Sequence, residues 1–391
     1  MHIAFILTVY ISNNFFLPKL RGDTMHTLTD TVTLPNGATL KNRLVIAPLT
    51  VCLSDANGYV TPQEVDYYAS RTGAVGMYIA GCSYIQPNGR GWLGEEAIYD
   101  DSFIPGLSKM AAAMKRNGTK AIMQIFHAGR MAEADAIFGH DLVSAGDVAA
   151  PLEGYRTPRP LTEEEITDVI KNFKAATIRA IKAGFDGVEI HGANNYLIHQ
   201  FFSPHSNTRT DRWGGSLEKR AAFPLAVVEA VLCAAREAGR KDFIVGYRLS
   251  PREQWTPGIT LKDTLYLVDK LASLQLDYLH ISQSHIGSVA TEQGYTDKSI
   301  LAYINETVNG RLPIISVGNI QTRSDVEEAL TNSDMVAVGG SALIDPNWAA
   351  KLLNNHDAAI RTKLAPEDCE ILKVSPLAYK ILASRAPERI L

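Results

Sequence analysis

The chain has 391 residues, of which 46% are hydrophobic and 20% charged, and its formal net charge is −4. This composition is typical of a globular enzyme with a large core, and the mildly acidic balance argues against nucleic acid or an anionic membrane as the main partner. The four cysteines form no C-x-x-C motif. Their spacing excludes a zinc knuckle or an iron–sulfur cluster, predicts no metal, and fits a reducing cytoplasm.

The chain begins with an apolar segment, MHIAFILTVYISNNFF. No basic residue precedes it, no small-residue cleavage site follows, and it is too short to span a bilayer. A signal peptide or anchor is the alternative, but we expect residues 1–24 to be a non-essential extension, with the natural start near Met25. Because no linker or low-complexity segment divides the remainder, residues 25–391 are predicted to form a single domain.

Eight short apolar runs rich in β-branched residues follow, each bounded by glycine, proline or asparagine. They cover residues 44–49, 75–80, 121–126, 187–191, 243–249, 278–282, 313–317 and 335–339. Amphipathic stretches lie between them, and Thr162 followed by Glu165 predicts a helix that begins with a capping box. Eight strands alternating with helices predict a closed parallel sheet, a (β/α)8 TIM barrel of the α/β class. The segment 127–160 is too long for one helix and predicts an inserted excursion over the barrel mouth, after strand three.

Polar residues cluster where these strands end, which is the edge that carries the chemistry in such barrels. Any one of them alone would more often be a cap or a turn former, but together they favour a ligand site. The residues are Thr50, Gln124, His127, His191, Asn194, Tyr196, Arg248, Gly318 and Asn319.

Glycines end the last two predicted strands, in SVGNI and VGGSALIDP. They could merely turn the chain, but Gly318, Gly339 and Gly340 would also let backbone N–H groups approach a phosphate. Arg248 ends an apolar run and needs a partner as a buried cation, while Gln124 offers both a donor and an acceptor. Flavin mononucleotide (FMN) meets these demands, with its phosphate at the glycines and its ring across the barrel centre. GRGWLG matches a dinucleotide-binding fingerprint literally, but it lacks the strand-to-helix context.

Five segments carry a resemblance to a known family: NGATLKNRLVIAPLT, QIFHAGR, HGANNYLIHQFFSPHSNTRTDRWGGSLEKR, GYRLSP and SVGNI. Between about residue 28 and residue 350, the chain resembles the Old Yellow Enzyme family of NAD(P)H-dependent flavin oxidoreductases. The resemblance implies non-covalently bound FMN and NADH or NADPH as hydride donor. It further implies hydride transfer from flavin N5 to an activated alkene, such as an α,β-unsaturated carbonyl compound. It leaves a homo-oligomer open, since relatives often pair through barrel helices and C-terminal segments.

The same resemblance implies roles for residues at the rim. His191 and Asn194 would bind the carbonyl oxygen of the substrate, and Tyr196 would protonate the α-carbon as the catalytic acid. Cofactor contacts would come from Pro48, Leu49, Thr50, Cys82, Gln124, Arg248, Gly318, Asn319, Gly339 and Gly340.

Three positions depart from the family pattern. Cys82 replaces a small residue, usually alanine, that faces the flavin. Gly340 stands where an arginine commonly reaches the phosphate, which predicts a phosphate site that relies on backbone N–H groups alone. Asn195 replaces a glycine, and we expect it to crowd the substrate or to change the loop conformation. The C-terminal SRAPERIL is expected to fray, with contact to a neighbouring subunit as the alternative.

Two other functions compete with alkene reduction. Reduced flavin meets many acceptors, so a flavoprotein that reduces nitro compounds, quinones or oxygen is one alternative. A non-catalytic barrel that binds FMN weakly is the alternative from a different class.

Overall fold

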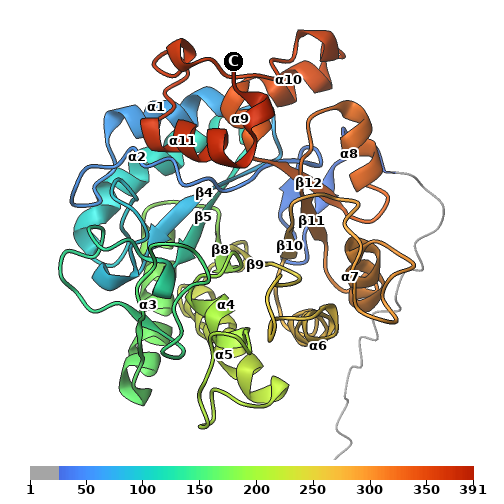
Figure 1. Ribbon diagram of the computed structural model, residues 1–391. Helices are drawn as coiled ribbons and strands as arrows, with labels where there is room; N and C mark the ends of the chain where they lie inside the picture. The colour runs from blue at the N-terminus through green and yellow to red at the C-terminus, as the bar shows by residue number, and fades with distance from the viewer. Residues whose placement is uncertain (1–25) are drawn as a thin grey trace, which may run out of the picture.

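The computed structural model describes residues 26–391, so the expected N-terminal extension, residues 1–24, lies outside the described residues. Eight parallel strands close into a barrel in the order β10-β11-β12-β3-β4-β5-β8-β9 (Figure 1). All eight predicted strands and the (β/α)8 architecture are confirmed. The strands are β3 (Leu44–Ile46), β4 (Met77–Tyr84), β5 (Lys120–Phe126), β8 (Gly187–Gly192), β9 (Ile244–Leu249), β10 (Tyr278–Ser282), β11 (Ile314–Val317) and β12 (Met335–Val338).

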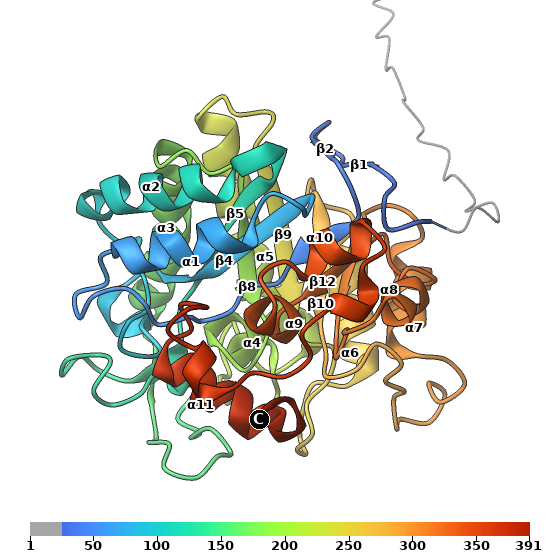
Figure 2. The same cartoon turned by 90° about the horizontal axis from the view of Figure 1, so that it is seen from above.

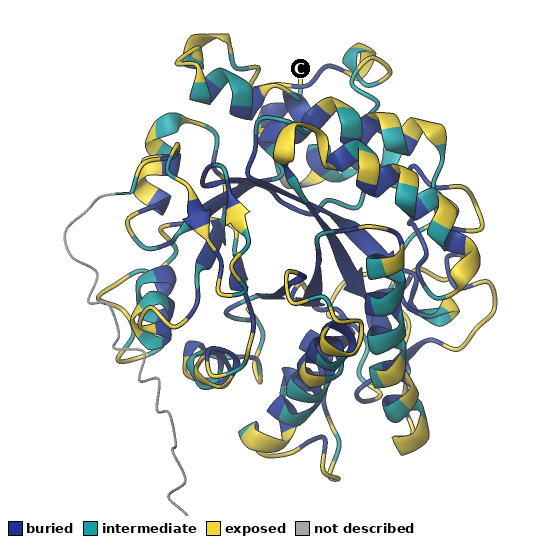
Figure 3. Cartoon of the chain, turned by 180° about the vertical axis from the view of Figure 1, so that it is seen from behind, coloured by how far each residue is buried: buried dark blue, intermediate teal, exposed yellow. Residues whose placement is uncertain are grey.

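Helices cover the outside of the barrel and turn their apolar faces toward the strands (Figure 3). The predicted capping box is present, because the Thr162 side chain accepts from the Glu165 N–H and the Glu165 side chain accepts from the Thr162 N–H. In the described part of the chain, no helix is both long enough and apolar enough to cross a membrane. The helices are α1 (Pro62–Arg71), α2 (Ile104–Met114), α3 (Glu163–Lys182), α4 (Leu197–Phe202), α5 (Leu217–Glu237), α6 (Leu261–Leu271), α7 (Ile300–Val308), α8 (Arg323–Ala329), α9 (Gly340–Ile344), α10 (Trp348–Leu353) and α11 (Pro376–Arg385).

Apolar side chains fill the barrel interior at the N-terminal ends of the strands, and we call this cluster the apolar floor. Side chains alternate along a strand, so Met77 and Ile79 of β4 join this inner cluster while Tyr78 and Ala80 pack against the helices. The hairpin of β1 (Val32–Thr33) and β2 (Thr39–Leu40) adds its buried apolar side chains to the same cluster. Polar chemistry inside the barrel is therefore confined to the C-terminal half of the strands.

Strand β4 extends further than its apolar run predicts. Its pairing with β5 shifts register between Ala80 and Ser83 and then resumes, with Tyr84 opposite Phe126. Such an irregularity re-aims the side chains of a strand near its end. Cys82, expected after the strand, consequently lies within it.

The predicted excursion after the third barrel strand is present over residues 127–160. It contains a turn of 3-10 helix, η4 (Gly129–Met131), and the short parallel pair β6 (Val143–Ser144) and β7 (Arg159–Pro160). Gln200 of α4 holds it at the rim: its Nε2 donates to the Ala128 carbonyl, and its Oε1 accepts from the Arg130 N–H and the Ser144 hydroxyl. The excursion thus packs beside the C-terminal end of β8.

Candidate active site

Five polar side chains lie inside the barrel above the apolar floor, and we call them the inner polar layer: Gln124, Glu189, His191, Arg248 and His280. The alternation of strands places them there, because each stands two or four residues beyond an inward-facing position at the start of its strand. The strand register puts Gln124 opposite Glu189, and Arg248 opposite both His191 and His280. None is more than 7% exposed.

Glu189 is the centre of the inner polar layer. Its Oε1 accepts from Gln124 Nε2 at 2.7 Å, and its Oε2 lies 2.9 Å from His280 Nδ1. Burial acts to raise the pKa of this carboxyl, but His280, Arg248 and the Gln124 hydrogen bond hold the pKa below its ordinary value. Burial lowers the pKa of His280 against the opposing effect of Glu189. The pair is therefore an ionised carboxylate and a neutral imidazole that donates from Nδ1.

Arg248 is a buried cation whose guanidinium is not fully hydrogen-bonded by the protein. Its Nε is buried and has no hydrogen-bond partner among the described residues. Burial lowers the pKa of its guanidinium, and the charge of Glu189 opposes that shift. An unpaired buried donor costs about 1–3 kcal/mol. Arg248 therefore suits a ligand that brings acceptor atoms, and the carbonyl edge of an FMN ring fits this requirement.

His191 is a neutral hydrogen-bond donor. Burial, followed by the nearby charge of Arg248, holds the pKa of its imidazole well below the ordinary value. The Ala193 N–H donates to Nδ1 at 3.3 Å, which assigns Nδ1 as the acceptor and leaves the ring proton on Nε2. His191 can therefore offer one N–H to a ligand at any pH near neutrality.

Asn194 is oriented in a similar way. Its Oδ1 accepts from the Ser250 and Ser282 hydroxyls at 3.2 and 3.0 Å, and its backbone N–H donates to Ser250. Because its carbonyl oxygen is engaged by two hydroxyls, the side-chain NH2 is the group that stays available to a ligand. Its φ of 56° is left-handed, a conformation that asparagine tolerates better than most residues.

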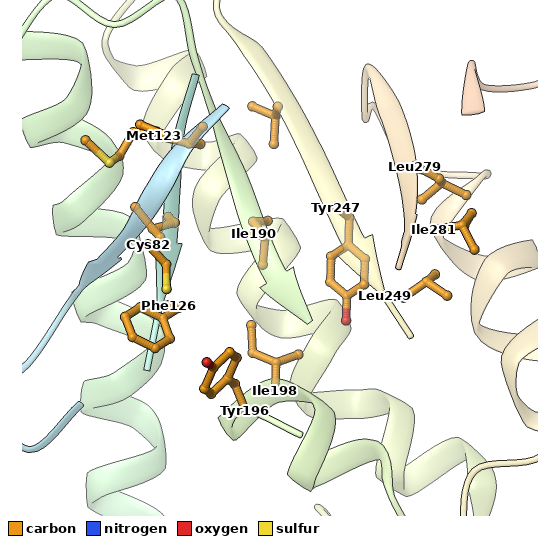
Figure 4. Close-up of a cluster of buried hydrophobic side chains, with 14 of the residues drawn as sticks. Cys82, Met123, Phe126, Ile190, Tyr196, Ile198, Tyr247, Leu249, Leu279 and Ile281 are labelled. Carbon is orange, nitrogen blue, oxygen red and sulfur yellow. The ribbon is translucent and has the colours of Figure 1, made fainter. Parts of the chain in front are cut away.

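Tyr196 stands where β8 passes into α4, and aromatic rings surround it. Its ring centroid lies 4.8 Å from that of His191, 5.1 Å from Phe126 and 6.2 Å from Trp92. Figure 4 shows Cys82 and Phe126 near the ends of the neighbouring strands β4 and β5, and Tyr196 beyond them at the start of α4. Trp92 comes from the segment GRGWLG, so that segment contributes an aromatic wall at the end of β4.

The predicted residues after β3 reach the same region. Thr50 Oγ1 lies 3.6 Å from Cys82 Sγ, which joins the ends of β3 and β4, and Pro48 is buried beside them. Leu49 approaches the end of the neighbouring strand β12: a β-carbon on Gly339 would meet its Cδ2 at 3.1 Å. Burial, reinforced by Glu95, raises the pKa of the Cys82 thiol well above its ordinary value. Cys82 is thus a protonated, buried thiol and not a reactive thiolate.

The two glycine segments after β11 and β12 lie together. Ser341 donates its hydroxyl to the Ile320 carbonyl at 2.7 Å, which joins one segment to the other. Close packing explains Gly318, since a β-carbon there would come within 2.9 Å of the His285 backbone. Asn319, next to it, adopts a left-handed φ of 49°. The two segments in which the sequence predicts a phosphate site therefore lie side by side, and that site stays a prediction.

Asn195 points away from the inner polar layer. Its Oδ1 accepts from Arg130 Nη2 at 2.8 Å, and its Nδ2 lies 3.2 Å from Met131 Sδ. Asn195 therefore contacts the excursion, and both of its expected effects, on the loop conformation and on the substrate, stay predictions. The left-handed φ of 62° explains why a glycine would also fit here.

Glu189, His280 and Trp92 are site residues that motif reading missed. Glu189 and His280 could have been found from strand alternation, because each is an ionisable residue in an apolar strand that faces the same way as His191 or Arg248. No sequence pattern around Trp92 indicates that it lies in the site. Its place depends on how the loop after β4 folds against Tyr196.

Comparison with known proteins identifies the barrel. Residues 31–358 match the model of the NADH:flavin oxidoreductase / NADH oxidase family. The chain belongs to this family. The resemblance to Old Yellow Enzyme is therefore confirmed, and the protein is an NAD(P)H-dependent flavin oxidoreductase whose cofactor is FMN.

Individual relatives agree with this family. A probable NADH-dependent flavin oxidoreductase of Bacillus subtilis (strain 168), YqiG, is 44% identical over 88% of this chain and 92% of its own length. The NADH:acrylate oxidoreductase of Vibrio harveyi is also 44% identical over 92% of this chain, but the match covers only 36% of that longer protein. Among solved structures, morphinone reductase superposes with a TM-score of 0.72 at 26% identity, over 85% of this chain and 90% of that one.

Proposed function

We propose that this flavin oxidoreductase reduces alkenes conjugated to a carbonyl group. The observation that carries the proposal is the donor arrangement at the end of β8. The acceptor atoms of His191 and Asn194 are both engaged within the protein, by the Ala193 N–H and by two serine hydroxyls. Each residue is left with an N–H to offer, and two N–H donors suit a carbonyl oxygen that gains negative charge during reduction.

The cofactor would supply the hydride transfer, and residues of the chain would hold the cofactor in place. When bound, FMN accepts a hydride from NADH or NADPH and passes it to the acceptor. Arg248 would meet the electron-rich edge of its ring, and Gln124, Thr50 and Cys82 would line it, with Pro48 and Leu49 in apolar contact. Gly318, Asn319, Gly339 and Gly340 would receive the phosphate.

His191 and Asn194 would bind the substrate carbonyl and stabilise the enolate. Each such donor is expected to contribute about 2.7–4 kcal/mol of transition-state stabilisation. The depressed pKa of His191 keeps its imidazole neutral, so its donor does not change with pH in the neutral range. A neutral donor also places no second positive charge beside Arg248.

Tyr196 would supply the proton to the α-carbon. A phenol holds its proton at neutral pH and can still act as an acid toward an enolate. Its ring is fixed by Phe126, His191 and Trp92 from three different segments, which suits a group that must meet one face of a substrate.

The experiment that tests the proposal separates reduction of the flavin from its reoxidation. The enzyme is bleached anaerobically with NADH or NADPH and then mixed with 2-cyclohexenone in D2O. We expect the flavin colour to return and the product to carry deuterium at its α-carbon. If the enone fails to reoxidise the flavin while a quinone or oxygen succeeds, alkene reduction is not the reaction of this site.

A second candidate is transfer of reducing equivalents to an acceptor other than an alkene, such as a nitro compound, a quinone or oxygen. One observation favours it: the description of the family includes NADH oxidases. The names of two relatives at 44% identity point instead to acrylate and fumarate, which are alkenes conjugated to a carboxyl group, but the match covers only 36% and 35% of the length of those proteins. Rates of reoxidation by the enone, a quinone and oxygen, measured on the same reduced sample, decide between the two candidates.

A further inference from the structure

The side chain of Arg389, near the C-terminus, lies against the glycine that follows β12. A β-carbon placed on Gly340 would stand 2.9 Å from Nη1 of Arg389 and 3.9 Å from its Cζ. The guanidinium therefore occupies the space into which a side chain at position 340 would extend. The sequence predicts a phosphate site without a cation here, but the fold brings a cation to it from the far end of the chain.

Arg389 is a buried charge without a carboxylate partner. It is 7% exposed, and within residues 26–391 no carboxylate lies at ion-pair distance from it. Its Nε donates to the Thr362 carbonyl and its Nη2 to the Ser341 hydroxyl, both at 3.4 Å. Burial lowers the pKa of the guanidinium against the opposing charge of Glu388. A cation buried beside two distant neutral acceptors is costly unless an anion joins it.

The C-terminal segment holds Arg389 in this place. The Leu364 N–H donates to the Arg389 carbonyl at 2.9 Å, and the Leu391 N–H donates to the Leu364 carbonyl at 3.0 Å. Leu382 of α11 also packs against Gly340, at 3.7 Å from the same β-carbon position. Figure 2 shows α11 and the C-terminus beside α9, so the segment that was expected to fray packs on its own barrel.

The position of Arg389 coincides with the junction of the two glycine segments. Its Nη2 bonds the Ser341 hydroxyl, and that hydroxyl donates to the Ile320 carbonyl after β11. No hydrogen bond within the described residues engages Nη1, the atom nearest Gly340. Nη1 is therefore an available donor on a guanidinium that already bonds Ser341 in the segment after β12 and, through that hydroxyl, is linked to the segment after β11.

We propose that Arg389 is the phosphate-binding cation of the FMN site, supplied by the C-terminal segment in place of a side chain at position 340. It would bind a phosphate oxygen through Nη1 and neutralise part of the charge of the phosphate. The inference concerns the cofactor and not the acceptor, so it stands or falls independently of alkene reduction.

The test compares two flavins that differ only in the phosphate. Full-length protein freed of FMN is titrated with FMN and with riboflavin, and binding is followed by quenching of flavin fluorescence. We expect Arg389→Ala to weaken FMN binding about 10- to 100-fold, the range for a hydrogen bond to a charged group, and to leave riboflavin binding unchanged. Arg389→Lys keeps the charge and should lose less. Arg361→Ala removes an exposed arginine paired with Asp368 and should change neither affinity.

A rescue variant keeps the proposal falsifiable if removal of Arg389 loosens the tail. Gly340→Arg restores a cation on the other side of the same space, and Gly340 does not have a positive φ that would oppose a side chain. In the Arg389→Ala background, Gly340→Arg should recover most of the lost FMN affinity. Equal loss of FMN and riboflavin affinity that Gly340→Arg does not repair would assign Arg389 a structural role. Unchanged FMN affinity in Arg389→Ala would also overturn the proposal.

Discussion

The two sides of the barrel mouth hold their polar groups in different ways. On the side of β5, β8, β9 and β10, side chains of the strands fix one another, and Glu189 lies at the centre of their hydrogen bonds. On the side of β11 and β12, the strands end in glycines, and the charged group comes from the C-terminal segment. The first side is encoded within the strands, whereas the second is assembled from segments far apart in the sequence.

This difference separates the groups proposed to meet the substrate and the flavin ring from those proposed to bind the phosphate. Changes on the first side should alter proton transfer, polarisation of the substrate or the charge balance of the barrel. Changes on the second should alter affinity for the phosphate and leave the reaction of the bound cofactor intact. A substitution on one side that produced the effect expected of the other side would contradict this division.

The largest effect is expected from Tyr196→Phe. Removal of a catalytic acid typically slows a reaction by about 10²–10⁴-fold, so reoxidation by an enone should slow within that range. Reduction of the flavin by NADH or NADPH needs no such proton and should change little. Stopped-flow absorbance of the flavin measures both steps on one sample. Equal slowing of the two steps would contradict the role of Tyr196 as proton donor.

Glu189→Gln should destabilise the fold, because it leaves Arg248 without its nearby negative charge. Loss of one partner of a buried charged pair typically costs about 3–5 kcal/mol in free energy of unfolding. The pKa of Glu189 is lowered in the fold, so its contribution is present above the ordinary pKa and is lost as the pH falls through the folded value. The difference in urea unfolding between wild type and variant should therefore narrow on acidification. The control is Glu229→Gln, at an exposed glutamate that pairs with no cation among residues 26–391, with little change at any pH.

Asn194→Ala should slow enone reduction by about 10²–10³-fold, the usual cost of one oxyanion donor. Ser282→Ala gives a finer measurement, since it removes one of the two hydroxyls that orient the Asn194 amide and leaves the donor itself in place. We expect its effect to be smaller and to be seen in the rate of reoxidation rather than in flavin binding. A Ser282→Ala loss as large as that of Asn194→Ala would show that Ser282 itself meets the substrate.

The barrel and half of its mouth could be predicted from the sequence because both depend on local patterns. Apolar runs bounded by turn residues gave all eight strands, and the strand ends pointed to His191, Asn194 and Arg248. The same alternation would have revealed Glu189 and His280 if it had been applied to charged residues inside the apolar runs. The end of β4 was missed because its register shift depends on pairing with β5.

The rest could not be predicted because it depends on contacts between distant segments. Nothing near Gly340 indicates that Arg389 approaches it, and nothing in GRGWLG indicates that Trp92 faces Tyr196. The direction of Asn195 depends in the same way on Arg130, which belongs to the excursion. A local pattern fixes which residues face the barrel interior, but only the folded chain shows what approaches them from elsewhere.

The smallest effect is expected at Asn195, where the two substitutions glycine and alanine should rank in an informative order. Both remove the hydrogen bond to Arg130, but only alanine must then hold a side chain at a φ of 62°. Glycine accepts that conformation freely, so Asn195→Gly should lose about 1 kcal/mol of unfolding free energy and Asn195→Ala about 1 kcal/mol more. Because the side chain faces the excursion, both variants should change KM for the acceptor more than the rate of flavin reduction. If Asn195→Gly instead speeds turnover of bulky enones without loss of stability, the side chain crowds the substrate after all, and its bond to Arg130 does not persist during catalysis.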